Sequence, residues 1–185
     1  MTKSIVLMRF SSRDFGNSAA IAHYLSKYYR HTTIKSFTVD TALVRPCNNC
    51  DYECLQPEKT CPNLTDSYKE LMDQICSADL VYFIVPNYCG YPCANYFAFN
   101  ERSVGYFNMD SALLQKYMEV PKRFIVISNC EEQNFIGAMQ QQVTAEPDIL
   151  YLKCSKYGKK SIAGDILDSD AAKADLKAFL ESSVF

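Results

Sequence analysis

The sequence predicts a single doubly wound α/β domain, in which helices cover both faces of a parallel sheet. Four short, unbroken apolar runs recur at wide spacing along the 185 residues, at 5–8, 80–85, 124–127 and 149–152. Continuous β-favouring runs of this kind are typical of strands that are covered on both faces. Helical patterns separate the runs, as parallel strands require, because each strand must return through a long right-handed crossover.

The amino-terminal half shows this alternation in order. A strand at 5–8 precedes a helix whose apolar residues repeat with helical spacing from 21 to 28. Either residue of the Asn17-Ser18 pair can cap that helix. A strand at 33–39 mixes apolar and polar residues, as an edge strand would, and a second helical repeat runs from 68 to 75.

The carboxyl-terminal half continues the pattern without a repeat or an interdomain linker. In chain order we expect strands at 80–85, 124–127 and 149–152 and helices at 95–106, 135–143 and 169–180. The only long irregular segment is 45–63, where the cysteines gather. We therefore expect one domain over residues 1–185 with a cysteine-rich loop at 45–63, a size that buries a core without disulfides or metal.

Composition excludes several classes of function. The net charge is −2 and the isoelectric point is near 5.7, which offers no electrostatic footprint for nucleic acid. The first apolar run is too short for a signal-peptide core and no run approaches membrane-spanning length, so we expect a cytoplasmic protein with no membrane partner. Nine cysteines in a reducing compartment are interpreted as thiols, metal ligands or redox groups before disulfides.

The loop from Phe10 to Ser18 follows the first strand and opens into a helix. Small hydroxyl residues, one arginine and one glycine let backbone N–H groups converge on an anion at the positive helix end, which suits a phosphate monoester. The lysine of a GxxxxGK[ST] loop is missing, which argues against a nucleotide triphosphatase. An ordinary capped turn has the same composition, so the position after the first strand favours the anion site.

Two further loops follow central strands, where ligands of open α/β sheets bind. Residues 86–93 contain tyrosines and a glycine that can form a wall and a close backbone approach for a flat aromatic ring. A rigid turn whose tyrosines pack on neighbouring helices is the alternative. Residues 128–134 are polar and can line the same crevice.

Four cysteines in the irregular segment, Cys47, Cys50, Cys54 and Cys61, supply enough soft ligands for a tetrahedral zinc or a [4Fe-4S] cluster. A reduced, metal-free loop beside the active site is the alternative that the residues leave open.

These residues together resemble the NADPH-dependent FMN reductase and iron-sulfur flavoprotein family. Residues 10–18 are similar to its GSPRxxGNT phosphate loop, and residues 46–50 to its PCxxC segment. Residues 80–91 are similar to its strand and flavin loop, and residues 95–105 to its next helix, which ends in a basic residue, here Arg102. The likeness covers roughly the first 107 residues.

Two positions depart from the family pattern. Phe10 stands where the family usually has glycine, so the loop cannot use a positive φ cheaply at that position. One extra residue separates Cys50 from Cys54 in comparison with the iron-sulfur members.

The resemblance implies a flavodoxin-like, five-stranded sheet of order 2-1-3-4-5. It also implies an FMN-dependent NAD(P)H oxidoreductase that passes electrons to a small-molecule or redox-protein acceptor, with the flavin carrying the chemistry and no catalytic side chain. A homodimer or tetramer is implied as well. The implied cofactor contacts are Ser11, Arg13, Phe15, Asn17, Ser18, Pro86, Asn87, Tyr88, Cys89, Gly90, Tyr91, Ser128 and Asn129.

Two alternatives share this fold. One is an iron-sulfur flavoprotein electron carrier with a [4Fe-4S] cluster on Cys47, Cys50, Cys54 and Cys61. The other is a non-catalytic module in which the same cysteines hold a structural zinc.

Overall fold

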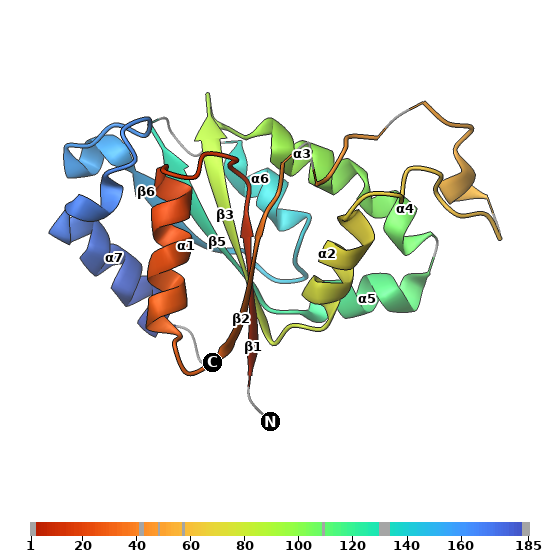
Figure 1. The fold of residues 1–185 in the computed structure, drawn as a ribbon, viewed down its shortest axis with the longest axis horizontal. Helices are drawn as coiled ribbons and strands as arrows, with labels where there is room; N and C mark the ends of the chain where they lie inside the picture. The colour runs from red at the N-terminus through yellow and green to blue at the C-terminus, as the bar shows by residue number, and fades with distance from the viewer. Residues whose placement is uncertain are drawn as a thin grey trace.

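The fold is a parallel sheet between two layers of helices, as the sequence predicts (Figure 1). The computed structural model describes residues 3–40, 43–47, 49–56, 58–108, 110–129 and 134–182. Five parallel strands lie in the order β2-β1-β3-β5-β6, which is the expected 2-1-3-4-5, and β4 adds an antiparallel pairing to β3. The strands are β1 (Ser4–Arg9), β2 (Thr33–Thr38), β3 (Leu80–Tyr88), β4 (Tyr91–Pro92), β5 (Lys122–Ser128) and β6 (Asp148–Lys153).

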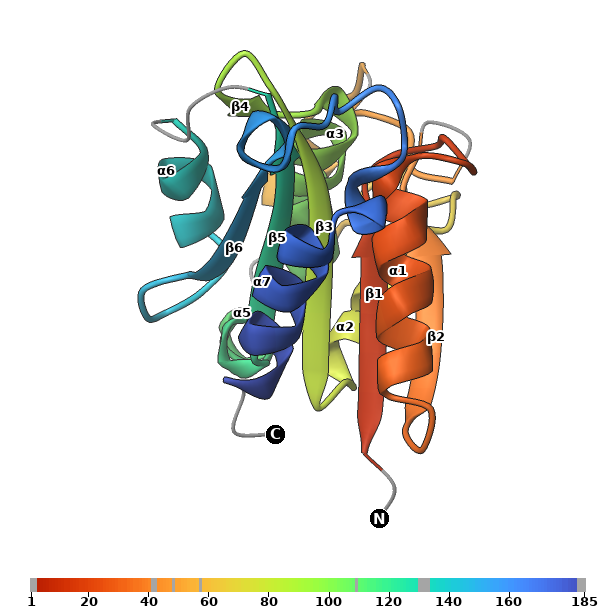
Figure 2. The same ribbon diagram turned by 90° about the vertical axis from the view of Figure 1, so that its left-hand side faces the viewer.

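The helices divide unequally between the two faces of the sheet (Figures 1 and 2). One face carries α1 (Asn17–Tyr28) and α7 (Asp170–Glu181). The other face carries α2 (Tyr68–Cys76), α3 (Ala94–Glu101), α4 (Ser103–Phe107), α5 (Ser111–Glu119) and α6 (Phe135–Gln140). Short 3-10 helices are η1 (Glu53–Leu55), η2 (Cys154–Tyr157) and η3 (Ile166–Asp168).

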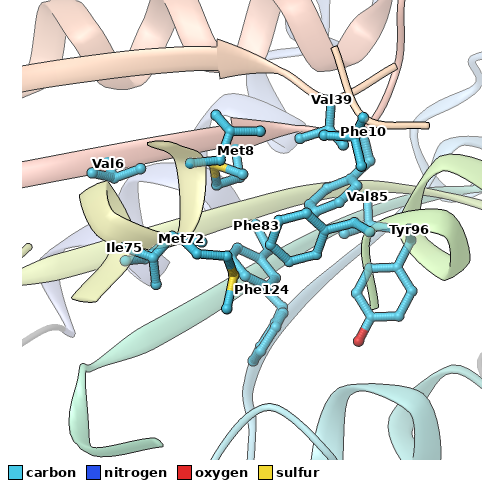
Figure 3. Packing of buried hydrophobic residues seen from close by; sticks show 14 of the residues in the cluster. Val6, Met8, Phe10, Val39, Met72, Ile75, Phe83, Val85, Tyr96 and Phe124 are labelled. Atoms are coloured by element: carbon cyan, nitrogen blue, oxygen red, sulfur yellow. The ribbon is translucent and has the colours of Figure 1, made fainter. Parts of the chain in front are cut away.

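Strand β3 lies in the middle of the sheet, and this position explains why its sequence is an unbroken apolar run. Val81, Phe83 and Val85 face the α2 side, and the alternate residues face α1 and α7. Figure 3 shows Phe83 in the same buried cluster as labelled residues from β1, α2 and β5. Because helices cover both faces of the sheet, neither side of β3 faces water, and its residues need not alternate between apolar and polar.

Four details differ from the sequence-based expectation. The helix expected at 95–106 is divided at Arg102 into α3 and α4, and the one expected at 135–143 ends at Gln140. Helix α1 has Gly16 at its N-cap without a side-chain bond, so the prediction that Asn17 or Ser18 caps it was wrong. Helix α5 was not predicted, although Asp110 accepts a hydrogen bond from the Leu113 N–H as its cap.

No helix in the described part of the chain combines the length and apolar character that crossing a bilayer would require.

Candidate functional site

Phe10 does not need the conformational freedom of glycine. It is 1 % exposed, and its ring packs edge-on against Phe83, Tyr96 and Phe99 at centroid distances of 5.4, 5.5 and 5.5 Å (Figure 3). Its N–H still donates to the Ile84 carbonyl at 3.0 Å, as if β1 continued. Phe10 is not among the described residues with positive φ. The aromatic ring therefore anchors the start of the loop in the core, and the anion-binding part begins at the next residue.

Loop 1, residues 10–18, folds back on itself before α1. The Arg13 N–H donates to Ser11 Oγ at 3.5 Å, and the Gly16 N–H donates to the Arg13 carbonyl at 3.4 Å. Asn17 and Ser18, 3 % and 4 % exposed, lie in the first turn of α1, whose leading N–H groups have no partner within the helix. Such a turn, with an arginine beside it, can bind an anion.

Loop 1 meets the end of β3 in a single pocket. Its lining residues are Ser11, Arg13, Gly16, Asn17, Ser18, Pro86, Asn87, Tyr88, Ile127, Ser161 and Ile162. The expected phosphate contacts and the start of the expected ring contacts thus lie together. Phe15, also an expected contact, does not line this pocket and is 96 % exposed. The cavity between these side chains is small, about 40 Å³.

The remaining ring contacts lie on a tight hairpin between β3 and β4. Cys89 and Gly90 form its turn with φ of 53° and 86°, a left-handed pair of the kind that two-residue hairpins favour. Tyr88 and Tyr91 pair across the hairpin and are 59 % and 52 % exposed. The hairpin therefore presents two aromatic faces next to the pocket. Burial raises the pKa of the Cys93 thiol behind it, which donates to the Phe10 carbonyl at 3.1 Å and is a packing residue.

The third expected loop is described only in part, because residues 130–133 lie outside the described ranges. Ser128 is fully buried at the end of β5. Asn129 is bound to Ser161: its Nδ2 donates to Ser161 Oγ at 2.7 Å, and its Oδ1 accepts from the Ser161 N–H at 3.1 Å.

Sequence reasoning missed Ser161 and Ile162. They follow η2, far along the chain from loop 1, and carry no motif. The feature that could have pointed to them is Gly164, which has a φ of +78° and lies so close to loop 1 that a Cβ there would be 2.5 Å from the Phe15 carbonyl oxygen.

The four cysteines of the cysteine loop, residues 45–63, also come together. Cys47, Cys50, Cys54 and Cys61 line one pocket of about 280 Å³ with Glu101 and Arg102. Burial, with further contributions from neighbouring thiols, raises the pKa of Cys47 and of Cys54. Among the described residues, however, no group of three or more His, Cys, Asp or Glu is arranged to hold a metal ion.

Arg102 fixes the two ends of the cysteine loop. Its side chain is fully buried, and Nη1 donates to Asp66 at 2.9 Å and to the Arg45 carbonyl at 2.6 Å. Nη2 donates to the Asn63 carbonyl at 2.5 Å. Burial opposes the charge of Asp66, but hydrogen bonds from Arg102 and from the Arg45 and Tyr68 N–H groups outweigh it and hold its pKa below the usual range. The division between α3 and α4 thus places a buried cation beneath the loop.

Comparison with solved structures identifies the fold. The chain is similar to the Trp repressor binding protein from Bacillus subtilis, with a TM-score of 0.64 and 13% identity over 98% of this chain and 99% of that one. It is also similar to an FMN-dependent NADH-azoreductase from Bacillus anthracis in complex with FMN, with a TM-score of 0.63 and 12% identity over 97% and 99%. FerB, an NAD(P)H:(acceptor) oxidoreductase from Paracoccus denitrificans, matches at 0.51 and 16% identity over 97% and 96%.

At these identities the likeness shows a flavodoxin-like fold. No protein-family model matches the chain, and no curated protein matches it in sequence.

Proposed function

We propose that this protein is an FMN-dependent oxidoreductase that takes electrons from NAD(P)H and passes them to an acceptor. The observation that carries the proposal is the single pocket in which the anion-binding turn of loop 1 meets the aromatic hairpin. It lies between β1 and β3 at the carboxyl ends of the strands, the switch point where this fold class binds nucleotides. The flavin enzymes among the structural neighbours support the same reaction type.

The donor set suits the phosphate of FMN. Arg13 supplies a cation, Ser11 and Ser18 supply hydroxyl groups, and the first turn of α1 supplies N–H groups. Asn17 was expected to bind the phosphate too. Its Oδ1 and Nδ2 instead bond to the Ile166 N–H and the Ser161 carbonyl, so we assign it to positioning the loop.

The hairpin suits the flat ring. Tyr88 and Tyr91 would cover a face of the isoalloxazine, with the backbone of Cys89 and Gly90 at its edge. When bound, FMN supplies the hydride and electron chemistry, and the protein orients it and controls access of water. We also propose a small molecule or a redox protein as acceptor and a homodimer or tetramer as the assembly.

FMN titration of Arg13→Ala tests the proposal. A charge-assisted bond to the phosphate predicts a loss of about 1.5 to 3 kcal/mol, roughly ten- to 150-fold in Kd. Arg30→Ala is the matched control, because Arg30 is an exposed arginine just beyond the far end of α1. Equal affinities of the two variants would remove Arg13 from the site. Failure of the wild-type protein to take up FMN or to oxidise NADH or NADPH in its presence would refute the function.

A second candidate is the iron-sulfur flavoprotein, favoured by the convergence of Cys47, Cys50, Cys54 and Cys61 on one pocket. Assays of iron, sulfide and zinc in protein purified without oxygen test this candidate. About four irons and four sulfides per chain would support the cluster, and zinc alone would support the structural-zinc alternative.

A further inference from the structure

A segment distant in sequence closes the candidate phosphate site. Residues 158–165, here called the strap, connect η2 to η3 and arc over the carboxyl ends of the strands to the start of α1 (Figure 2). Two of its residues, Ser161 and Ile162, line the same pocket as Ser11, Arg13 and Ser18.

The strap is fastened to loop 1 by the arginine that would bind the anion and by Asn17, which positions the loop. Arg13 Nη2 donates to the Ile162 carbonyl at 2.9 Å, and Asn17 Nδ2 donates to the Ser161 carbonyl at 3.0 Å. On its other side, Ser161 forms the reciprocal pair of hydrogen bonds with Asn129. The arginine of the site is thus engaged by a neutral carbonyl oxygen.

The space left under the strap is too small for the cofactor. The cavity of about 40 Å³ accommodates a few water molecules, whereas pockets for ligands of cofactor size measure roughly 300 Å³ or more. The closed strap leaves room for a phosphate group at most, and a phosphate on Arg13 Nη2 would have to displace the Ile162 carbonyl, so binding of the phosphate with its ribityl chain requires the strap to move outward.

The strap has the features of a segment that can move as a unit. Glycines with positive φ, Gly158 at 67° and Gly164 at 78°, stand near its two ends, where backbone rotation costs little. The strap binds Arg13 through the uncharged Ile162 carbonyl oxygen. A phosphate dianion forms a stronger bond with the same guanidinium, because both partners are then charged.

We infer that the strap is an intramolecular competitor for the phosphate site: it holds Arg13 in the closed position and must release it before FMN can bind. The inference rests on the proposed function and adds to it a control on cofactor uptake. The rate of FMN association is then set by how often the strap opens, and weakening the strap speeds uptake.

Stopped-flow fluorescence of FMN mixed with the apoprotein tests this with Asn129→Ala, which removes both bonds to Ser161. We expect the association rate constant to rise about tenfold, because two hydrogen bonds of the closed state are lost. Ser155→Ala is the control: Ser155 is exposed on η2, just before the strap, and should behave as wild type.

Hydrogen exchange of the wild-type protein provides a second measurement that needs no variant. The Ser161 N–H, bonded to Asn129 in the closed strap, should lose protection when FMN binds. An unchanged association rate constant in Asn129→Ala, or increased protection of the Ser161 N–H with FMN, would each overturn the inference that the strap competes for the phosphate site. Absence of FMN binding by the wild type and by Asn129→Ala would instead overturn the proposed function.

Discussion

Loop 1 and the cysteine loop both follow strands of the same sheet, β1 and β2, but they are held in contrasting ways. Loop 1 is fastened by several neutral or singly charged hydrogen bonds to distant segments, among them Arg13 to Ile162 and Asn17 to Ser161. The cysteine loop is fastened at its ends by one buried cation, Arg102, which bonds to Asp66 and to two backbone carbonyls.

The contrast explains which region can respond to a ligand. Separate hydrogen bonds can be exchanged one at a time, at a cost of about 1 kcal/mol for a neutral bond and roughly 1.5 to 3 kcal/mol for the bond of Arg13, so loop 1 and the strap can open without unfolding. A buried ion pair cannot be released in this way, because either partner left alone is an uncompensated charge. The ends of the cysteine loop are therefore fixed whether or not its thiols bind anything.

The largest effect is expected from breaking the buried ion pair of Arg102 and Asp66, here called the clamp. Arg102→Met leaves Asp66 without its buried cation, with only the exposed Arg45 guanidinium at 4.0 Å, and should lower the free energy of unfolding by about 3 to 5 kcal/mol. The matched control is Lys69→Ala, which breaks an exposed pair with Asp73 and should change stability by no more than about 0.5 kcal/mol. Urea denaturation measures both. Similar stabilities of the two variants would contradict the clamp.

A smaller effect is expected where the strap touches loop 1. Gly164→Ala brings a Cβ to 2.5 Å from the Phe15 carbonyl oxygen, whereas Gly158→Ala meets nothing within 4 Å. Both glycines have positive φ, so each substitution carries the left-handed penalty of about 1 to 2 kcal/mol. Thermal unfolding should show Gly164→Ala to be less stable than Gly158→Ala by a further ~1 kcal/mol. Equal melting temperatures would mean that the close approach is relieved without cost.

The sheet could be predicted from the sequence because its signal is local. Unbroken apolar runs such as the one in β3 mark strands buried on both faces, and the edge strand β2 shows itself by its polar residues. Short helices were harder: α5 has nine residues, and the Arg102 junction between α3 and α4 has no glycine or proline to mark it.

The site could be predicted only in part, for a related reason. Loop 1 and the hairpin carry recognisable residues, but their partner, the strap, contributes backbone carbonyls at Ser161 and Ile162 that any sequence could supply. The bonds of Asn17 to Ser161 and Ile166 are an example, because nothing in the residues around Asn17 announces them. When a side chain bonds to a backbone group far away in the sequence, the residues around it carry no signal of that contact.

The clamp also predicts how stability depends on pH. The pKa of Asp66 lies below its ordinary value of 3.8, so its contribution is fully present above about pH 4 and is lost as the pH falls through the folded-state value. In Arg102→Met that pKa loses its largest lowering contribution, while the hydrogen bonds from the Arg45 and Tyr68 N–H groups remain. The difference in free energy of unfolding between wild type and Arg102→Met should therefore narrow as the pH falls below about 4 in urea titrations. A difference that stays constant with pH would show that protonation of Asp66 does not weaken its pair with Arg102.

The smallest expected effect is a difference between the alkylation rates of two thiols, one in the hairpin and one in the cysteine loop. Cys89 and Cys47 are both exposed, but Cys89 lies in the turn of the hairpin proposed to hold the flavin ring, and Cys47 lies in the cysteine loop. Saturating FMN should slow alkylation of Cys89 by a few-fold, because the bound ring covers the turn. The alkylation rate of Cys47 should not change. Peptide mass spectrometry after brief treatment with iodoacetamide gives both rates in one sample. Protection of Cys47 rather than Cys89 would place the cofactor at the cysteine loop and reverse the assignment of the two regions.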